Sequence, residues 1–321
     1  TNRAMSFMMP ALMFVMNGVS VLIIWVAAKK IDQGVMEVGT MTAFITYSMM
    51  IIMGFLMLTM VSIMLPRAAV AANRIDEVLK TEITIKDSHN ALTEKTNNAV
   101  VKFDHVDFKY ADGEENVLED IDFEAKPGQT VAIIGSTGSG KSTLAKLIPR
   151  FFDVTNGKIT LDGVDIRDIS IETLRSQIGY VPQTGILFSG DINSNISYGA
   201  PGIDEAGIKE AAQIAQATEF IEDKPDKFES AIAQGGTNVS GGQKQRLSIA
   251  RAIARNPKIY IFDDSFSALD FKTDTQLRKA LKPKTKDATV FIVAQRVSTI
   301  LHADQILVLD EGKLVGKGTH K

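Results

Sequence analysis

Cysteine is absent from the sequence, which excludes disulfide bonds and metal sites built from thiolates. Its absence says little about the cellular compartment. A surplus of positive charge is lacking too, because 35 Lys and Arg residues against 38 Asp and Glu residues give a formal net charge of −3. A basic surplus is the usual mark of a nucleic-acid-binding protein, so no nucleic-acid partner is expected. A chain of 321 residues is long enough for two or three structural units.

Charged side chains are missing from two long stretches near the N-terminus, residues 4–28 and 38–66. All 13 methionines lie between Met5 and Met64, within or beside these stretches. A helix over the first stretch would be about 37 Å long, more than the ~30 Å of a bilayer's hydrocarbon core. A cleaved signal peptide fits less well, because its apolar region has only about 7–15 residues and a second span would not follow so closely. We therefore predict two transmembrane helices.

Beyond Pro66 the pattern predicts that the second helix continues to about residue 80. Residues 81–98 are polar and aperiodic, which indicates a linker. The sequence thus predicts a membrane part at residues 1–80, a linker at 81–98 and a soluble domain at 99–321.

A glycine-rich stretch at residues 135–143 fits the phosphate-loop pattern G-x-x-x-x-G-K-[ST]. An apolar run precedes it and a helical pattern follows, which is the context that the pattern requires. The backbone N–H groups of such a loop and the following helix N-terminus attract phosphate; Lys141 would reach the β- and γ-phosphates, and the Ser142 hydroxyl would bind Mg²⁺. The alternative is a glycine-rich turn that binds nothing. The predicted nucleotide-binding residues of the loop are Gly135, Ser136, Thr137, Gly138, Ser139, Gly140, Lys141, Ser142 and Thr143.

Polar side chains follow two further apolar runs. Gln183 comes at the end of the predicted strand 178–182, where α/β folds place ligand groups. Asp263 and Asp264 end the predicted strand that starts at Ile259. Beside the phosphate-loop strand, Asp263 would reach the Mg²⁺ shell and Asp264 an attacking water. The alternative is that both carboxylates cap a loop.

Two other features have competing interpretations. Ser240-Gly241-Gly242 opens a helical pattern that runs to Ala254, which fits either a second anion site or a simple helix cap. Tyr110 lies about 25 residues before the glycine loop and could stack on a nucleobase. The local sequence favours an ordinary tyrosine at a strand end.

These motifs together resemble the ATP-binding cassette (ABC) transporters, specifically the exporters that fuse a six-span membrane domain to an ATPase domain. Val239-Ser-Gly-Gly-Gln243 resembles the family signature, usually Leu-Ser-Gly-Gly-Gln, and Gln183 resembles the Q-loop glutamine. Residues 259–263 resemble the Walker B motif, and residues 267–270 the D-loop with its Asp270. The resemblance covers the whole chain. It implies an α/β P-loop NTPase fold, an ABC ATPase with a β-subdomain and a helical subdomain, preceded by the fifth and sixth transmembrane α-helices of an exporter.

The resemblance also implies roles for individual residues. Ser142, Gln183 and Asp263 would hold Mg²⁺, and Tyr110 would stack on the adenine of ATP, which reverses the local interpretation. In that family two ATPase domains face each other head to tail, so a signature contacts the ATP held by the other domain. The signature residues here are Ser240, Gly241, Gly242 and Gln243.

The resemblance implies an ATP hydrolase coupled to export in the plasma membrane, multi-pass, with its ATPase domain in the cytosol. The expected partners are a second ABC half-transporter, the lipid bilayer and an unidentified transported substrate. The Lys29–Lys30 loop would then lie outside, against the positive-inside rule. The family pattern also predicts four further spans before Thr1 and another helix after Lys321.

Two positions depart from the family pattern, and both are catalytic. The family normally has Glu where this chain has Asp264, a carboxylate retracted by roughly 1.5 Å. It normally has His where this chain has Gln295, and Gln carries neither a proton nor a positive charge. Since a misplacement of about 1 Å can cost ~10²-fold in rate, we predict the degenerate, slowly hydrolysing half of a heterodimer. The alternatives are a homodimer with two active sites, a soluble signature-bearing ATPase acting on DNA, and a nucleotide sensor.

Overall fold

The protein is described by a computed structural model covering residues 2–295 and 300–320. The predicted boundaries at residues 1 and 321, and residues 296–299 of the predicted soluble domain, lie outside the described residues. The chain divides into two compact units, one ending at Ile83 and one beginning at Thr84. Each unit is described by itself.

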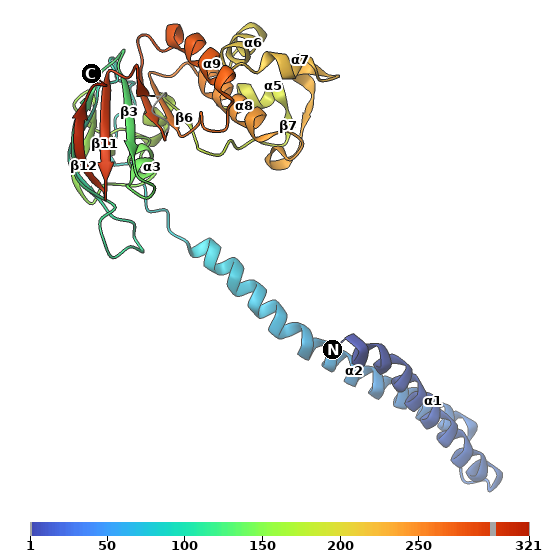
Figure 1. Ribbon diagram of the computed structural model, residues 1–321. Helices are drawn as coiled ribbons and strands as arrows, with labels where there is room; N and C mark the ends of the chain where they lie inside the picture. The colour runs from blue at the N-terminus through green and yellow to red at the C-terminus, as the bar shows by residue number, and fades with distance from the viewer. Residues whose placement is uncertain (1, 296–299, 321) are drawn as a thin grey trace. The chain divides into compact units, whose positions relative to one another are not determined.

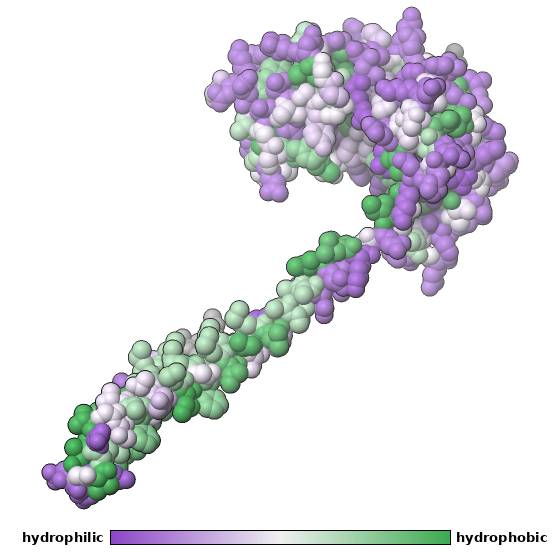
Figure 2. Space-filling view, turned by 180° about the vertical axis from the view of Figure 1, so that it is seen from behind, coloured by the Kyte–Doolittle hydropathy of each residue, from purple (hydrophilic) through white to green (hydrophobic). Residues whose placement is uncertain are grey.

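The first unit consists of two apolar helices at the positions predicted for the membrane part. Helix α1 spans Asn2–Asp32 and helix α2 spans Val38–Lys80. Both are long and apolar enough, by length and composition, to cross a membrane. Figure 2 shows hydrophobic side chains over most of their visible surface. Hydroxyl groups within these helices donate to the carbonyl one turn earlier, as Ser62 does to Leu58 at 2.8 Å, which satisfies them without water.

The second unit is built around a ten-stranded sheet in the order β5-β4-β1-β2-β12-β11-β3-β10-β9-β6 (Figure 1). Strands β11, β3, β10, β9 and β6 are parallel, whereas β5, β4, β1 and β2 pair antiparallel. The strands are β1 Val101–Phe108, β2 Leu118–Ala125, β3 Thr130–Gly135, β4 Asn156–Leu161, β5 Val164–Asp165, β6 Ile178–Val181, β9 Ile259–Asp263, β10 Thr289–Val293, β11 Gln305–Asp310 and β12 Lys313–Gly318. Strands β7 Gly190–Asp191 and β8 Ala231–Ile232 form a separate two-stranded sheet.

Helices lie against the parallel half of the sheet. Most of them, α5 to α9, gather at one side of the unit, as the predicted helical subdomain requires (Figure 1). The helices are α3 Lys141–Leu147, α4 Ile171–Ser176, α5 Ile192–Ser197, α6 Glu205–Ile214, α7 Thr218–Glu222, α8 Gly241–Ala254 and α9 Phe271–Lys284. Short 3-10 helices are η1 Ile166–Asp168, η2 Lys227–Glu229 and η3 Gln234–Gly236.

The parallel strands separate two hydrophobic cores. Ile259 and Ile261 of β9 point into one core, and Tyr260 and Phe262 into the other. Because successive strand residues face opposite sides of a sheet, a strand buried on both sides is a continuous apolar run. The apolar runs in the sequence therefore correctly predicted these strands, and with them the sheet edge at which Asp263 and Asp264 emerge.

The helical pattern of residues 203–220 is interrupted in the structure, which has two helices there, α6 and α7. The break lies at Gln216, whose φ of 56° is outside the helical region. Strands β4 and β5 form a hairpin, and Asp162 and Gly163 in its turn both have positive φ, as a tight hairpin turn requires.

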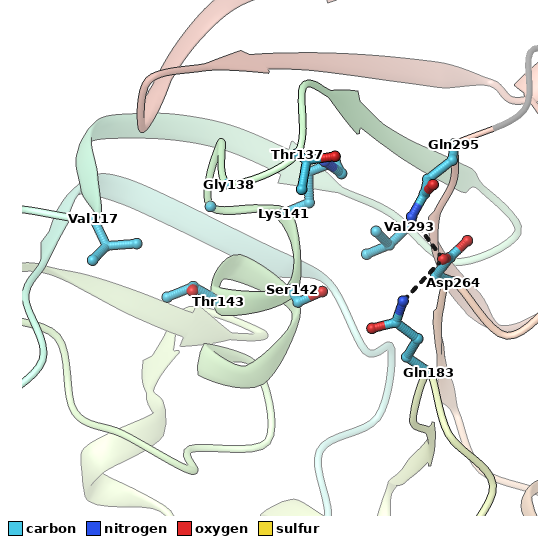
Figure 3. A pocket seen from close by; sticks show the side chains of 11 residues that line it. Val117, Thr137, Gly138, Lys141, Ser142, Thr143, Gln183, Asp264, Val293 and Gln295 are labelled. Carbon is cyan, nitrogen blue, oxygen red and sulfur yellow. Dashed lines mark hydrogen bonds between the residues drawn. The ribbon is translucent and has the colours of Figure 1, made fainter.

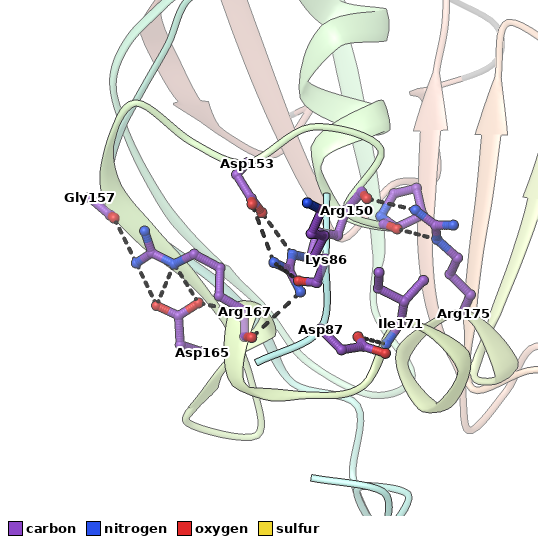
Figure 4. A network of polar contacts seen from close by, with 10 residues as sticks. Lys86, Asp87, Arg150, Asp153, Gly157, Asp165, Arg167, Ile171 and Arg175 are labelled. Atoms are coloured by element: carbon purple, nitrogen blue, oxygen red, sulfur yellow. Dashed lines mark hydrogen bonds and ion pairs between the residues drawn. The ribbon is translucent and has the colours of Figure 1, made fainter. Parts of the chain in front are cut away.

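The predicted linker is hydrogen-bonded to the second unit from residue 86 onward. Arg150 donates through Nη2 to the Lys86 carbonyl at 3.1 Å, and the Asp87 carboxylate accepts from the Ile171 N–H at 2.7 Å (Figure 4). Further along, the Leu92 N–H donates to the Asp168 carbonyl at 2.7 Å. Residues 86–98 are thus an irregular but fixed part of this unit.

We expect Arg150→Met to destabilise the second unit by about 2 kcal/mol, a loss of about 5 °C in Tm. The Arg150 side chain is 5% exposed and pairs with Asp153 at 2.7 Å, so its removal leaves a carboxylate and the Lys86 carbonyl without their donor. Thermal unfolding and limited proteolysis at residues 81–98 measure the effect. The matched control is Arg167→Met, because Arg167 pairs with Asp165 but is 41% exposed. Equal Tm values for the two variants would contradict the view that the buried Arg150 stabilises this unit.

Candidate functional site

The glycine loop connects β3 to α3, and its geometry requires glycine at two positions. A Cβ on Gly135 would lie 2.1 Å from the Leu309 carbonyl oxygen, and one on Gly140 would lie 2.7 Å from a Leu118 methyl carbon. Gly140 also has a φ of 93° and caps α3 without a side-chain hydrogen bond. The loop is therefore compressed against neighbouring backbone, while the first N–H groups of α3 remain available to a ligand.

Lys141 folds back over this loop. Its Nζ donates to the Gly135 carbonyl at 3.0 Å and to the Ser136 carbonyl at 2.6 Å. Burial lowers the pKa of Lys141, whereas the charges of Asp264 and Asp263 act in the opposite direction. An ammonium group that donates to two neutral carbonyls and is partly desolvated is prepared for an anionic partner.

Ser142 and Asp263 meet at the carboxyl end of β9. The Ser142 hydroxyl donates to Asp263 Oδ1 at 2.7 Å, and Asp263 is 3% exposed. A second hydroxyl, that of Tyr180, donates to Asp263 Oδ2 at 3.0 Å. Burial, followed by the charge of Asp263, raises the pKa of Tyr180, so this hydroxyl keeps its proton.

These oxygen groups fit a Mg²⁺ ion that is held jointly with a nucleotide. Among the described residues there is no group of three or more His, Cys, Asp or Glu side chains that could hold a metal by itself. Mg²⁺ usually takes only one or two protein oxygens and completes its shell with water and substrate phosphates. The hydroxyl of Ser142 and the carboxylate of Asp263 are such a set, with the amide of Gln183 nearby.

Asp264 stands one residue beyond β9 in a strained conformation. Its φ is 48°, which is unfavourable for a residue with a Cβ, and its backbone N–H is held by the Val293 carbonyl at 3.2 Å. Its Oδ2 accepts from Gln183 Nε2 at 3.2 Å and from Gln295 Nε2 at 2.8 Å (Figure 3). The carboxylate is thus oriented by two neutral amides from two different strand ends.

A cavity of about 240 Å³ unites nine of the predicted residues. Its wall is formed by the phosphate loop on one side and by the ends of β6, β9 and β10 on the other (Figure 3). The lining residues are Val117, Thr137, Gly138, Gly140, Lys141, Ser142, Thr143, Gln183, Asp264, Val293 and Gln295. Lys141, Ser142, Gln183, Asp264 and Gln295 are therefore neighbours in space although they lie far apart in the sequence.

Other predicted residues lie next to this cavity. The Tyr110 hydroxyl shares a hydrogen bond of 3.0 Å with Thr143 Oγ1, and its ring packs edge-on against Phe108 and Phe152. Ser136 donates to Asp310 Oδ1 at 3.4 Å, and Ser139 is buried. The role of Tyr110 in stacking on adenine stays a prediction.

The signature residues and Asp270 lie apart from the cavity lining. Ser240 caps α8: its Oγ accepts from the Gln243 N–H at 3.3 Å, while Gln243 Oε1 accepts from the Ser240 N–H at 3.0 Å. Ser240 and Gly241 are nevertheless exposed, so the start of α8 is accessible from outside this chain. Asp270 caps α9 by accepting from the Thr273 N–H at 2.9 Å. Within one chain, both motifs act as helix caps.

Sequence reasoning missed Tyr180, Val117 and Val293. The two valines are strand-end residues without a distinctive pattern. Tyr180 carried a weak signal, because a tyrosine in a buried strand usually needs a partner for its hydroxyl. The sequence did not show that this partner is Asp263, 83 residues away.

Comparison with known proteins shows which proteins this chain is similar to. The family model described as ABC transporter matches residues 118–267. The chain is 44% identical to an uncharacterized ABC transporter ATP-binding protein of Mycobacterium bovis, over 98% of this chain and 55% of that protein. It is 38% identical to an ATP-dependent lipid A-core flippase of Desulfotalea psychrophila, over 97% of this chain and 55% of the flippase.

A solved structure is similar over almost the whole chain. The structure of a bacterial Atm1-family ABC exporter with ATP bound matches with a TM-score of 0.74 and 33% identity, over 99% of this chain and 56% of that one. The chain therefore spans about half the length of the relatives that it matches.

Proposed function

We propose that the chain is part of an exporter-type half-transporter of the ABC transporter family. The family model that matches residues 118–267 and the two apolar helices before that segment support this proposal. In this proposal ATP binding and hydrolysis drive the export of a substrate across the plasma membrane, with the ATPase domain in the cytosol. A second half-transporter would supply the signature that faces this chain's phosphate loop. The exposed start of α8 would in turn face the partner's nucleotide.

The chain's own residues have separate roles in this proposal. Lys141 and the loop N–H groups bind the phosphates, while Ser142 and Asp263, with Gln183, hold Mg²⁺. When bound, Mg²⁺ neutralises the charge that develops on the transferred phosphoryl group. Asp264 and Gln295 orient the attacking water. Burial of Asp263 and Asp264 keeps competing water away from their carboxylates.

We further propose that this chain is the degenerate half of a heterodimer, and one observation carries this proposal. Asp264 Oδ2 already accepts hydrogen bonds from two amides, those of Gln183 and Gln295. A shortened carboxylate held in this way is a weak base for water, and Gln295 supplies neither positive charge nor a transferable proton. The groups that hold the nucleotide, Lys141, Ser142 and Asp263, are intact. The site would therefore bind ATP and hydrolyse it slowly.

The decisive experiment uses the chain co-expressed with a candidate partner half-transporter, the first choice being one encoded by a neighbouring gene. ATP turnover is measured with Asp264→Asn in this chain, and separately with Glu→Gln at the corresponding position of the partner. A site that is ~10²-fold slower supplies only about 1% of the turnover, so Asp264→Asn should have almost no effect. The partner's substitution should abolish turnover. Loss of turnover with Asp264→Asn, or full transport by this chain purified alone, would contradict the heterodimer and support a homodimer.

A further inference from the structure

Both carboxylate oxygens of Asp263 are held by hydroxyl groups from different elements. Ser142 in the phosphate loop donates to Oδ1 at 2.7 Å, and Tyr180 on β6 donates to Oδ2 at 3.0 Å. A carboxylate can only accept hydrogen bonds from a hydroxyl, so the direction of the Tyr180 bond is fixed. With Asp263 3% exposed, little water is available to replace either donor.

The Tyr180 ring is itself fixed from behind. Phe151 packs edge-on against it, with ring centroids 5.4 Å apart, and the Arg175 guanidinium lies 5.3 Å from the Phe151 ring. Arg175 is anchored in turn, because it donates to the Pro149 carbonyl at 3.0 Å and to the Arg150 carbonyl at 2.8 Å. The strand pairing of β6 with β9 places Tyr180 opposite Ile261. The hydroxyl therefore meets Asp263 from a rigid support.

This support fixes the rotation of the Asp263 carboxylate. A free carboxylate can turn about its Cβ–Cγ bond, which is a soft torsion. Holding Oδ2 on the Tyr180 side leaves Oδ1 on the side of Ser142. Hydrogen bonds that orient a metal-binding side chain typically change metal affinity by about 10–100-fold.

We propose that Tyr180 is a positioning residue for the Mg²⁺ of the bound nucleotide, acting through Asp263. This inference rests on the proposed function of the phosphate loop as an ATP site. Tyr180 is not among the residues that line the cavity, so we expect its hydroxyl to govern how much Mg²⁺ the site needs rather than whether the loop binds phosphate. The chemical class of the ligand is a divalent cation that is shared with a nucleoside triphosphate.

The test uses full-length protein with its partner in lipid nanodiscs. Radiolabelled 8-azido-ATP is photo-crosslinked to the complex, and the two chains are separated on a gel, so that only nucleotide bound to this chain is counted. Labelling is measured in EDTA and over a Mg²⁺ titration. For Tyr180→Phe we expect the Mg²⁺ concentration of half-maximal labelling to rise about tenfold. Labelling in EDTA should equal that of the wild type.

Tyr260→Phe is the matched control. Tyr260 lies on the adjacent strand β9, is fully buried, and its hydroxyl has no hydrogen-bond partner among the described residues. Its removal should leave the Mg²⁺ requirement unchanged. Tyr180→Met also removes the hydroxyl. If the Tyr180→Phe variant does not fold, the Mg²⁺ requirement is measured with Tyr180→Met instead.

The outcomes separate the two proposals. Labelling of the wild type that is absent at all Mg²⁺ concentrations would overturn the nucleotide site itself. Normal labelling with the same Mg²⁺ requirement in wild type and Tyr180→Phe would overturn only the role of Tyr180. An equal shift with Tyr260→Phe would also overturn it, because any lost hydroxyl in the sheet would then act alike.

Discussion

Lys141→Met is expected to weaken nucleotide binding to this chain by about 10³-fold. A hydrogen bond to a charged group contributes roughly 1.5–3 kcal/mol, and Lys141 would donate at least two to the phosphates. Among the described residues, its Nζ has the Gly135 and Ser136 carbonyls as hydrogen-bond acceptors, which a phosphate would replace with charged ones. Photo-labelling with 8-azido-ATP at increasing nucleotide concentration measures the change.

The same substitution should leave the fold almost unaffected. Lys141 is only 9% exposed and its pKa is lowered by burial, so the ammonium carries a desolvation penalty that methionine does not have. We expect the Tm without nucleotide to stay within about 3 °C of the wild type, a change of roughly 1 kcal/mol.

Lys146→Met is the matched control, because Lys146 lies in the last turn of the same helix and outside the cavity lining. A loss of binding in both variants would show that helix α3, rather than the Lys141 charge, is responsible. Unchanged nucleotide binding with Lys141→Met would contradict the proposal that this loop binds the phosphates of a nucleotide.

Asp264→Glu combined with Gln295→His is expected to raise ATP turnover at this site by about 10²-fold. The added methylene extends the carboxylate by roughly 1.5 Å from a backbone that cannot follow it. That backbone is held by the 3.2 Å bond from the Asp264 N–H to the Val293 carbonyl. Histidine at position 295 replaces a neutral amide by a group that can carry positive charge. The cavity of about 240 Å³ beside these side chains gives them room.

The increase in ATP turnover must be measured in a complex whose second ATP site is inactive. We would therefore record ATP turnover in complexes whose partner carries Glu→Gln at the position that corresponds to Asp264. Asp263→Glu in the same background is the matched control: it adds one methylene to the neighbouring carboxylate, but both oxygens of Asp263 are already held by Ser142 and Tyr180. We expect no gain there. If Asp264→Glu with Gln295→His is no faster than its parent, the short carboxylate does not explain the slow site.

The local sequence pattern was sufficient to predict those structural features that depend on residues close together in the sequence. The phosphate loop needs Gly135 and Gly140 because a Cβ would collide with nearby atoms, and the chain displays both glycines at the required spacing. The turn at Glu311 and Gly312 has φ values of 45° and 79° and joins β11 to β12 in a hairpin. The apolar helices near the N-terminus follow from the absence of charge alone.

Pairings between distant segments could not be predicted in the same way. Tyr180 meets Asp263 only because β6 is added to the edge of the sheet beside β9, and the order of parallel strands is set by the packing of both cores. The hydrogen bonds between residues 86–98 and the rest of the second unit could not be predicted either, because an irregular segment has no periodicity that would indicate what it contacts. Backbone groups of such a segment still need partners, and here Arg150 and Ile171 supply them.

By itself, the sequence determined which groups we propose to hold a nucleotide, because Lys141 and Ser142 belong to one continuous loop whose chemistry is local. The sequence also showed directly that Asp264 and Gln295 stand where the family pattern has Glu and His. Only the tertiary structure decided that these two departures share one hydrogen bond at 2.8 Å, and that Tyr180 holds the adjacent carboxylate. Side chains that converge from the ends of separate strands are positioned by strand order and register, which are properties of the packed sheet.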